Sequence, residues 1–395
     1  MQRLGRVCAV LFVMAALNAV CTACASVESG SLDVGSETLE ETDDTETAET
    51  LAAENTKEDG QEDRVKVRGI YVTGPTAGSA AMEDMIRLVD ETELNAMVID
   101  VKNDEGYITY KMELEQAEAL GACIRYIPDM EALVAELKEH DIYSIARIVC
   151  FKDPILATDS DLILKKPDGT PVTDANGLAF VNPYREEVWE YLVDVAGKAA
   201  ELGFDEIQFD YVRFPVGEDA DAADYGVDVA EYPKEQAITD FLRYAAERLH
   251  RMDIAVGADV FGTIIGSETD IKQIGQNYQT IGSMLDVLSP MVYPSHYGPG
   301  VFGLEVPDAH PYETVLSALE GSARELAPVA EEERAVVRPW LQGFTASWIT
   351  GYIPYGGEEI RAQIQAVYDA GYDEWILWNA ANHYTADGLE LEEEP

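Results

Sequence analysis

The sequence has few cysteines and few cations, and each shortage excludes a class of protein. Three of the five cysteines, Cys8, Cys21 and Cys24, lie in the N-terminal leader, so a framework of several disulfides is excluded. Cys123 and Cys150 remain, either paired with each other or present as buried thiols. Lys and Arg number 27 against 75 Asp and Glu, which gives a net charge of −48. Nucleic acid and anionic polymers are therefore not expected as partners, because binding them requires clustered cations, whereas a neutral or cationic glycan fits.

Several motifs of cofactor and metal enzymes are also missing. The five histidines form no His-x-His or His-Glu-x-x-His pair, which argues against a zinc hydrolase, and no Gly-x-Ser-x-Gly elbow is present. Residues 73–78 lack the glycine spacing of a dinucleotide-binding turn. The acidic run 218–224 lacks the glycine turn and the final glutamate of a helix-loop-helix calcium site, so a solvated acidic loop is favoured. We therefore expect no metal and no obligatory cofactor.

The N-terminus has the pattern of an export signal. Basic residues precede an apolar stretch over 7–20 that is short for a transmembrane helix, which predicts a signal peptide over 1–25. Two outcomes stay open, cleavage at the small residues around Ala23 or lipidation at Cys24, the sole expected link to a membrane. Residues 26–63 are acidic and lack aromatics, which predicts a disordered linker, and residues 386–395 form an acidic tail. The protein is therefore expected to be extracellular or at the cell surface.

Between these ends, short β-branched runs alternate with longer helical patterns, as in repeated βα units. The predicted strands are Val67–Thr73, Ala96–Lys102, Tyr143–Val149, Glu206–Tyr211, Ala255–Phe261, Val287–Tyr293, Val336–Gln342 and Glu374–Asn379. The predicted helices are Met82–Glu91, Met130–His140, Arg185–Leu202, Lys234–Met252, Ile271–Met284, Tyr312–Leu326 and Glu358–Ala370. Eight such units predict an α/β fold, a closed (β/α)8 TIM barrel over residues 64–385. Two long connections, about 103–128 and 151–183, follow strands and would lie at the C-terminal face, where such barrels hold their chemistry.

Polar residues at the strand ends are the candidate catalytic groups. The predicted strands carry Asp100, Lys102, Arg147, Gln208, Asp210, Asp259 and Asn379, and Arg213 follows Asp210. Side chains alternate along a strand, so Asp100 should point the same way as Lys102, and Gln208 the same way as Asp210. Ionised carboxylates inside a strand require partners, which Lys102, Arg147 and Arg213 would supply. Several aspartates at one face would keep one of them protonated beside an ionised neighbour, the pair that glycoside hydrolysis uses.

Aromatic residues near the same strand ends suit a sugar, whose C–H faces stack on flat rings. Tyr211, Tyr293 and Trp340 are the expected sugar contacts, whereas Trp378 is expected to face the helices. His296 is a candidate ligand contact, with a surface loop position as the equal alternative. Gln342 and Asn379, together with Lys102, Arg147, Gln208 and Arg213, complete the predicted substrate-binding set.

Four strings give a family resemblance. They are Gly203-Phe-Asp-Glu-Ile-Gln-Phe-Asp-Tyr-Val-Arg-Phe-Pro215, Val98-Ile-Asp-Val-Lys-Asn-Asp-Glu-Gly106, Val181-Asn-Pro-Tyr184 and Trp375-Ile-Leu-Trp-Asn379. The chain from Val67 to Tyr384 resembles a bacterial family of predicted glycosyl-hydrolase domains, once a domain of unknown function. The Phe-Asp-Tyr-Val-Arg-Phe-Pro string is the specific one. The resemblance implies a (β/α)8 barrel and a glycosidase reaction, and names no sugar.

Strand position assigns the roles. The seventh strand carries no carboxylate, so the pair of glutamates after strands four and seven is not expected. The arrangement is similar to that of α-glycosidases, with Asp210 as nucleophile or transition-state stabiliser and Asp259 as acid/base. Asp100 is the substitute for either role. The hypothesis is a glycoside hydrolase acting on an extracellular or cell-envelope polysaccharide. The alternatives are a catalytically inactive glycan-binding barrel and a structural envelope protein.

Overall fold

The structure, a computed structural model, describes residues 64–391. The predicted signal peptide, the lipidation site at Cys24, the linker 26–63 and the last four residues of the tail lie outside this part of the chain. Among the described residues, no helix has the length and apolar character needed to cross a bilayer.

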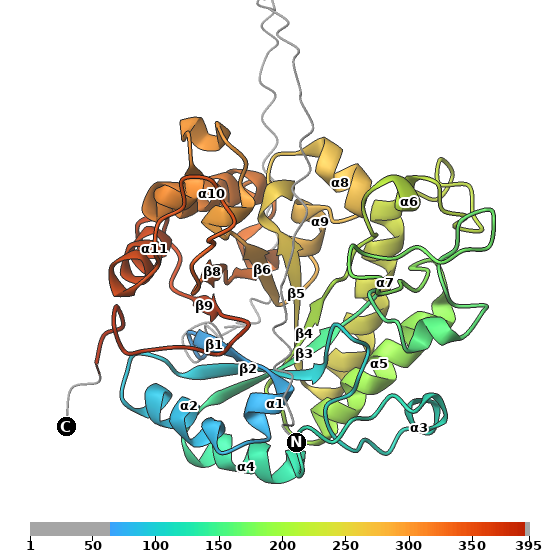
Figure 1. Cartoon of the computed structure of the whole chain (residues 1–395), viewed down its shortest axis with the longest axis horizontal. Helices are drawn as coiled ribbons and strands as arrows, with labels where there is room; N and C mark the ends of the chain where they lie inside the picture. Colours follow the sequence, from blue (N-terminus) through green and yellow to red (C-terminus); the bar gives the residue numbers. More distant parts are fainter. Residues whose placement is uncertain (1–63, 392–395) are drawn as a thin grey trace, which may run out of the picture. The chain divides into compact units, whose positions relative to one another are not determined.

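Parallel strands surround the centre of the molecule and close into a ring (Figure 1). The strands are β1 (Arg68–Val72), β2 (Ala96–Lys102), β3 (Tyr143–Val149), β4 (Glu206–Asp210), β5 (Ala255–Phe261), β6 (Val287–Met291), β7 (Val336–Val337), β8 (Trp340–Gln342) and β9 (Trp375–Trp378). The pairing of β5 with β6 closes the barrel. β7 and β8 both pair with β6 and are halves of one predicted strand, interrupted at Pro339, which has no N–H for the ladder. The predicted eight-sided TIM barrel is confirmed.

Helices surround the barrel and follow the predicted order. They are α1 (Gly74–Ala77), α2 (Ala81–Asp90), α3 (Glu115–Leu120), α4 (Met130–Glu139), α5 (Glu186–Glu201), α6 (Glu218–Asp221), α7 (Lys234–Leu249), α8 (Glu268–Ile274), α9 (Tyr278–Gly282), α10 (Pro311–Leu326) and α11 (Gly357–Asp369). The helix predicted over 271–284 is wrong, because α8 ends at Gly275 and α9 starts separately. Gly275 has a φ of 82°, and a Cβ there would lie 2.8 Å from the carbonyl oxygen of Lys234, so the chain must turn away from the helical path.

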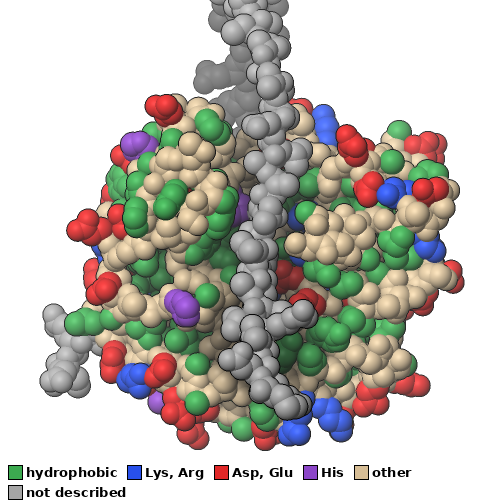
Figure 2. Space-filling view, viewed as in Figure 1, with side chains coloured by type: hydrophobic (Ala, Val, Ile, Leu, Met, Phe, Trp, Pro, Cys, Tyr) green, Lys and Arg blue, Asp and Glu red, His purple; other side chains and the backbone are tan. Residues whose placement is uncertain are grey.

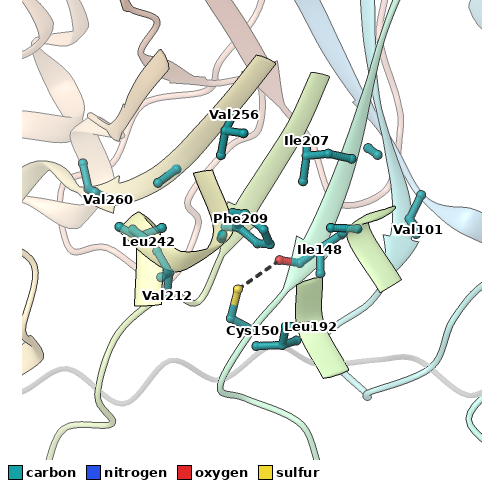
Figure 3. Packing of buried hydrophobic residues seen from close by; sticks show 14 of the residues in the cluster. Val101, Ile148, Cys150, Leu192, Ile207, Phe209, Val212, Leu242, Val256 and Val260 are labelled. Atoms are coloured by element: carbon teal, nitrogen blue, oxygen red, sulfur yellow. Dashed lines mark hydrogen bonds between the residues drawn. The ribbon is translucent and has the colours of Figure 1, made fainter. Parts of the chain in front are cut away.

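The strands divide their side chains between two cores. Residues that point outward, such as Phe209 and Val260, pack with Leu192 of α5 and Leu242 of α7 in the layer between barrel and helices (Figure 3). A second, smaller cluster fills the barrel interior and includes Tyr71, Tyr293 and Trp340. The period-two alternation of each strand produces this division. It decides which polar residues can meet inside the barrel.

A buried ion cluster fixes the N-terminal end of the barrel. Arg338, between β7 and β8, donates from Nη1 to Glu206 at 2.8 and 2.9 Å and from Nε to Glu374 at 2.8 Å. All three side chains are buried. The cluster joins the start of β4 to the segments leading into β8 and β9. Two carboxylates around one guanidinium avoid an unpaired charge in the interior.

Both described cysteines are free, so the open question of their pairing is answered in favour of thiols. Cys150 lies in the outer core, where its Sγ contacts the carbonyl oxygen of Ile148 at 3.5 Å (Figure 3). Cys123 is partly buried in the connection after β2.

Candidate active site

Three aspartates lie around one guanidinium at the C-terminal end of the barrel. Arg147 of β3 donates to Oδ2 of Asp210 from Nε at 2.9 Å and from Nη2 at 2.5 Å. Its Nη1 donates to Oδ1 of Asp100 at 2.6 Å, and its Nη2 lies 3.5 Å from Asp104. Burial opposes the charge of Arg147, but the carboxylates of Asp210 and Asp100 raise its pKa well above the usual range. The guanidinium therefore holds these carboxylates in place as a fixed positive charge.

Asp259 of β5 has a different environment from Asp210. Its Oδ1 accepts a hydrogen bond from Nε1 of Trp340 at 2.6 Å, while its Oδ2 is buried and has no hydrogen-bond partner within residues 64–391. Burial raises the pKa of Asp259 well above its usual range, and the negative charge of Asp210 raises it further. An Asp with a raised pKa keeps its proton at a pH where its neighbour is ionised.

The sheet register explains why these two residues meet. β4 and β5 pair in parallel with Phe209 opposite Ala258, and Asp210 and Asp259 are the residues that follow this pair. Phe209 and Ala258 belong to the outer core, so the alternation turns both aspartates into the barrel. Asp210 is 6% exposed and Asp259 is 1% exposed, so Asp210 lies nearer the opening.

Asp100 is a third carboxylate with an unusual environment. Tyr71 of β1 donates its hydroxyl to Oδ2 of Asp100 at 2.6 Å. Burial raises the pKa of Asp100 to about 6, although Arg147 and the Tyr71 hydrogen bond both favour the ionised form. Asp100 therefore titrates within the range where enzymes work.

Aromatic rings form one wall of the site. Tyr71 and Trp378 stack with ring centroids 4.0 Å apart, and Trp340 meets both rings edge-on at 6.4 and 5.5 Å. The guanidinium of Arg147 lies 5.4 Å from the Tyr71 ring and 5.3 Å from the Trp378 ring. The expectation that Trp378 faces the helices is wrong. Trp378 alternates with Trp375 and Leu377, which take the outward positions.

Tyr211 closes the end of β4 in a backbone conformation that is rare for such a residue. Its φ is 49°, and its amide N donates to Oδ1 of Asp210 at 2.5 Å. Its ring lies between two cations, with Lys152 Nζ at 4.8 Å and the Arg213 guanidinium at 5.2 Å. A strained backbone conformation of this kind persists only where surrounding contacts impose it. Here the conformation directs the Tyr211 amide to Oδ1 of Asp210.

Lys102 does not lie where strand alternation places it. The register shifts between Asp100 and Lys102, and the Lys102 side chain is fully buried. Its Nζ contacts Asp153 at 2.8 Å and the carbonyl oxygen of Val149 at 2.7 Å. The expectation that Lys102 binds the carboxylates of the site or sugar hydroxyls is corrected, because the irregularity in β2 directs its ammonium to the connection after β3.

Three predicted sugar ligands have their amides engaged by the protein. Gln342 bonds to Ser295, Asp308 and Phe344, and Asn379 bonds to the backbone of Gly343, Ala381 and His383. Gln208 lies beneath Asp210 and donates to Ser289 at 3.0 Å, while its Oε1 has no partner among the described residues. Gln342 and Gln208 are fully buried. Gln342 and Asn379 therefore hold loops, because their donors and acceptors are already used.

The remaining predicted contacts lie around the opening. Tyr293 is buried in the interior cluster, and burial together with Asp259 and Asp210 raises its pKa. Arg213 packs on the Phe261 ring at 4.7 Å and donates to the carbonyl oxygen of Phe214. His296 is half-buried beside Tyr293, and burial lowers its pKa to about 4, so its imidazole is neutral at pH 7.

Tyr71, Asp104 and Lys152 were absent from the predicted site. Lys152 lies 3.1 Å from Asp174 and 3.8 Å from Asp104, which links the connections after β2 and β3 beside the opening. Alternation could have found Tyr71, because its neighbours Ile70 and Val72 are strand hydrophobics of the outer core. Alternation could not predict the position of Lys152, because this residue lies in the long connection after a strand and not in the strand itself.

Burial and Arg147 have the larger effects on the pKa of Asp100, and the hydrogen bond from the Tyr71 hydroxyl lowers that pKa further, which gives a first test. We expect Tyr71→Phe to raise the pKa of Asp100 above about 6, because the lost hydrogen bond stabilises the carboxylate. A shift of about one unit corresponds to a bond worth about 1.4 kcal/mol. The measurement is a carboxyl ¹³C NMR titration. Tyr110→Phe is the control, because the buried Tyr110 hydroxyl has no hydrogen-bond partner in the described part of the chain, and equal midpoints in both variants would contradict the assignment.

Within residues 64–391, no three or more His, Cys, Asp or Glu side chains are grouped to hold a metal ion. The chemistry that the described site offers is that of carboxyl groups with different proton affinities beside aromatic rings.

Comparisons with known proteins identify the family of the chain and structures with a similar fold. A family described as "Putative glycosyl hydrolase domain" matches residues 69–384. No curated protein matches the chain. A hypothetical protein from Ruminiclostridium thermocellum is 34% identical, over 48% of this chain and 97% of its own, with a TM-score of 0.45.

Two further solved structures cover most of the barrel. The glycoside hydrolase domain of PgaB (BpsB) from Bordetella bronchiseptica is 13% identical over 82% of this chain and 98% of its own, with a TM-score of 0.60. The spore cortex-lytic enzyme SleL from Bacillus megaterium is 13% identical over 81% of this chain and 71% of its own, with a TM-score of 0.48. The likeness to the PgaB domain shows a shared fold.

Proposed function

Since the chain belongs to the family described as "Putative glycosyl hydrolase domain", we propose that it hydrolyses glycosidic bonds in an extracellular or cell-envelope polysaccharide. The observation that carries the proposal is the contrast between Asp210 and Asp259. They follow the paired residues Phe209 and Ala258, yet Asp210 is paired with Arg147, while Asp259 is buried with a raised pKa. Glycoside hydrolysis uses such a pair, one carboxylate ionised and one carboxyl protonated.

The division of labour follows from these environments. The protonated Asp259 donates its proton to the glycosidic oxygen as that bond breaks. The Asp210 carboxylate, held by Arg147 and the Tyr211 amide, stabilises the positive charge that develops at the anomeric carbon. Water adds to that carbon, and its released proton restores the acid. Asp100, with a pKa of about 6 and a direct bond to Arg147, tunes the charge of the same cluster.

An exported location fits this substrate. The leader 1–25 with its basic start and apolar run supports secretion or lipid anchoring at Cys24, outside the described residues. The net charge of −48 disfavours anionic polymers and leaves neutral or cationic glycans as the substrate class.

The proposal is tested by incubating the protein with a panel of envelope and exopolysaccharide fractions and measuring new reducing ends. We expect release from at least one fraction. A barrel that only binds glycans would be retarded in a polysaccharide-containing native gel while releasing no reducing ends from that polysaccharide. That result would replace the hydrolase with the inactive glycan-binding alternative, and neither binding nor release would leave a structural role.

A further inference from the structure

The opening of the barrel has two chemically different sides. The loop after β6 carries no Asp, Glu, Lys or Arg over residues 292–304, before Glu305 and Asp308, and the loop after β8 carries none over 343–356, although the chain is 26% charged. The connections after β3 and β4, on the other side of the ring, hold many charged residues, among them Lys152, Asp161, Lys166, Glu218 and Asp224. In Figure 2, green hydrophobic side chains gather on the lobe that carries α10, while red and blue side chains gather over the lobe that carries α6. Two neighbouring stretches on one side of the ring are thus built without charge.

Aromatic rings lead from the carboxylates along these uncharged stretches. Tyr293 packs in the interior cluster with Trp340, whose indole donates to Asp259, and its ring centroid lies 6.1 Å from that of Phe344. Phe344 stacks on Trp348 at 6.0 Å with an angle of 18° between the rings. Trp348 is 54% exposed. Exposing a large flat ring costs free energy unless a partner covers it, and here the exposed ring ends a path that starts at the candidate site.

The path is held rigidly by the protein. The side chain of Gln342 accepts from the amide of Ser295 at 3.0 Å and donates to Asp308 and to the carbonyl oxygen of Phe344 at 2.9 and 3.1 Å. The hydroxyl of Tyr355 donates to the carbonyl oxygen of Asp308 at 3.0 Å. These bonds join the loop after β6 to the loop after β8. A preformed surface binds with less loss of conformational entropy than a mobile one.

We propose that Phe344 and Trp348, which continue from the buried Tyr293, form a binding surface for a neutral polysaccharide chain, so that the enzyme cleaves within polymers. The inference rests on the proposed function for its cleavage step. A succession of rings suits several consecutive sugars, since each sugar presents an apolar face to a ring and its hydroxyls to water. A single terminal sugar would need only the pocket at the carboxylates. The two stretches without charge, 292–304 and 343–356, match an uncharged chain, which brings no groups that require ion pairs.

The test measures binding without turnover, by native electrophoresis of the full chain in gels containing one soluble polysaccharide. The neutral probes are hydroxyethyl cellulose, galactomannan and glycol chitin, and the anionic probes are polygalacturonate and alginate. We expect at least one neutral polymer to retard the protein, and Trp348→Ala to weaken that binding by about tenfold or more. Trp348→Phe should keep most of it, because a flat ring remains. The anionic polymers should have no effect.

Met252→Ala is the matched control, because it removes a 42% exposed apolar side chain just before β5, at the opposite end of the barrel. Equal binding by wild type and Trp348→Ala, stronger binding of an anionic polymer, or no retardation by any neutral polymer would overturn the inference. Binding that depends on Trp348 in a protein that releases no reducing ends would overturn the proposed hydrolysis and leave the binding surface standing. Hydrolysis with unchanged KM in Trp348→Ala would overturn the binding surface and leave the proposed hydrolysis standing.

Discussion

Replacing Asp259 by Asn should lower kcat on the best polysaccharide by about 10²–10⁴-fold, the usual contribution of a general acid. Asn has the shape of Asp but no acidic proton. Its Oδ1 can still accept the bond from Trp340 Nε1, which is 2.6 Å long in the wild type, so the fold and glycan binding should persist. The measurement is reducing-end release at saturating substrate, with binding checked by gel retardation.

Asp84→Asn is the control for this substitution, because Asp84 lies exposed on α2 beside Arg87. It should leave turnover unchanged. If Asp259→Asn kept turnover within tenfold of wild type, Asp259 would not be the acid. Asp100, with a pKa of about 6, would be the next residue to replace.

The pH profile should carry the same information. A general acid works only when protonated, so kcat/KM should fall as the pH rises through the raised pKa of Asp259. This alkaline limb should vanish in Asp259→Asn together with most of the activity. If the residual activity of Asp259→Asn kept the same alkaline limb in its pH profile, that limb would belong to the titration of another group.

Replacing Arg147 by Leu should lower the free energy of unfolding at pH 7 by about 3–5 kcal/mol, because it leaves buried carboxylates without their cation. Arg147 makes three hydrogen bonds to Asp100 and Asp210, all between buried groups. Urea denaturation followed by circular dichroism measures the loss. Arg147→Lys keeps the charge but loses the planar guanidinium that bonds to both aspartates, so its loss of unfolding free energy should be smaller.

The deficit of Arg147→Leu should shrink as the pH falls. Without the guanidinium, burial holds the folded-state pKa of Asp100 above the unfolded value near 3.8, and higher than the wild-type value of about 6. A carboxyl with a raised folded pKa destabilises the protein when ionised, and this penalty is absent below the unfolded pKa. The variant should therefore recover stability between pH 7 and pH 4. Arg243→Leu, which breaks an exposed pair with Asp240, should cost about 0–1 kcal/mol at any pH, and an equal loss in both variants would refute the argument.

Local sequence patterns predicted the barrel well. The strands β2, β3 and β5 begin and end at the predicted residues, because each is a β-branched or apolar run between polar turns. The error at residues 271–284 arose because apolar spacing continues through Gly275, whose backbone conformation and close approach to Lys234 end the helix. That contact joins segments far apart in the chain, so the spacing of apolar residues could not show it.

The same local sequence patterns predicted part of the candidate site. Strand ends and alternation indicated Asp100, Asp210 and Asp259 as interior carboxyls and Arg147 as a partner, and the structure brings these four side chains into one cluster. Their catalytic roles stay predictions. Alternation failed for Lys102, because an irregular register in β2 is set by the neighbouring strand β3.

By itself, the sequence determined the eight βα units and the residues that end each strand, because burial and alternation act over a few neighbouring residues. Only the tertiary structure decided which of these residues meet. The bonds of Arg147 span 47 residues to Asp100 and 63 to Asp210, and such contacts depend on barrel register and loop packing. The same holds for Gln342, whose side chain joins two loops. Register and loop packing are properties of the closed barrel, since each strand is positioned by neighbours that its own residues do not specify.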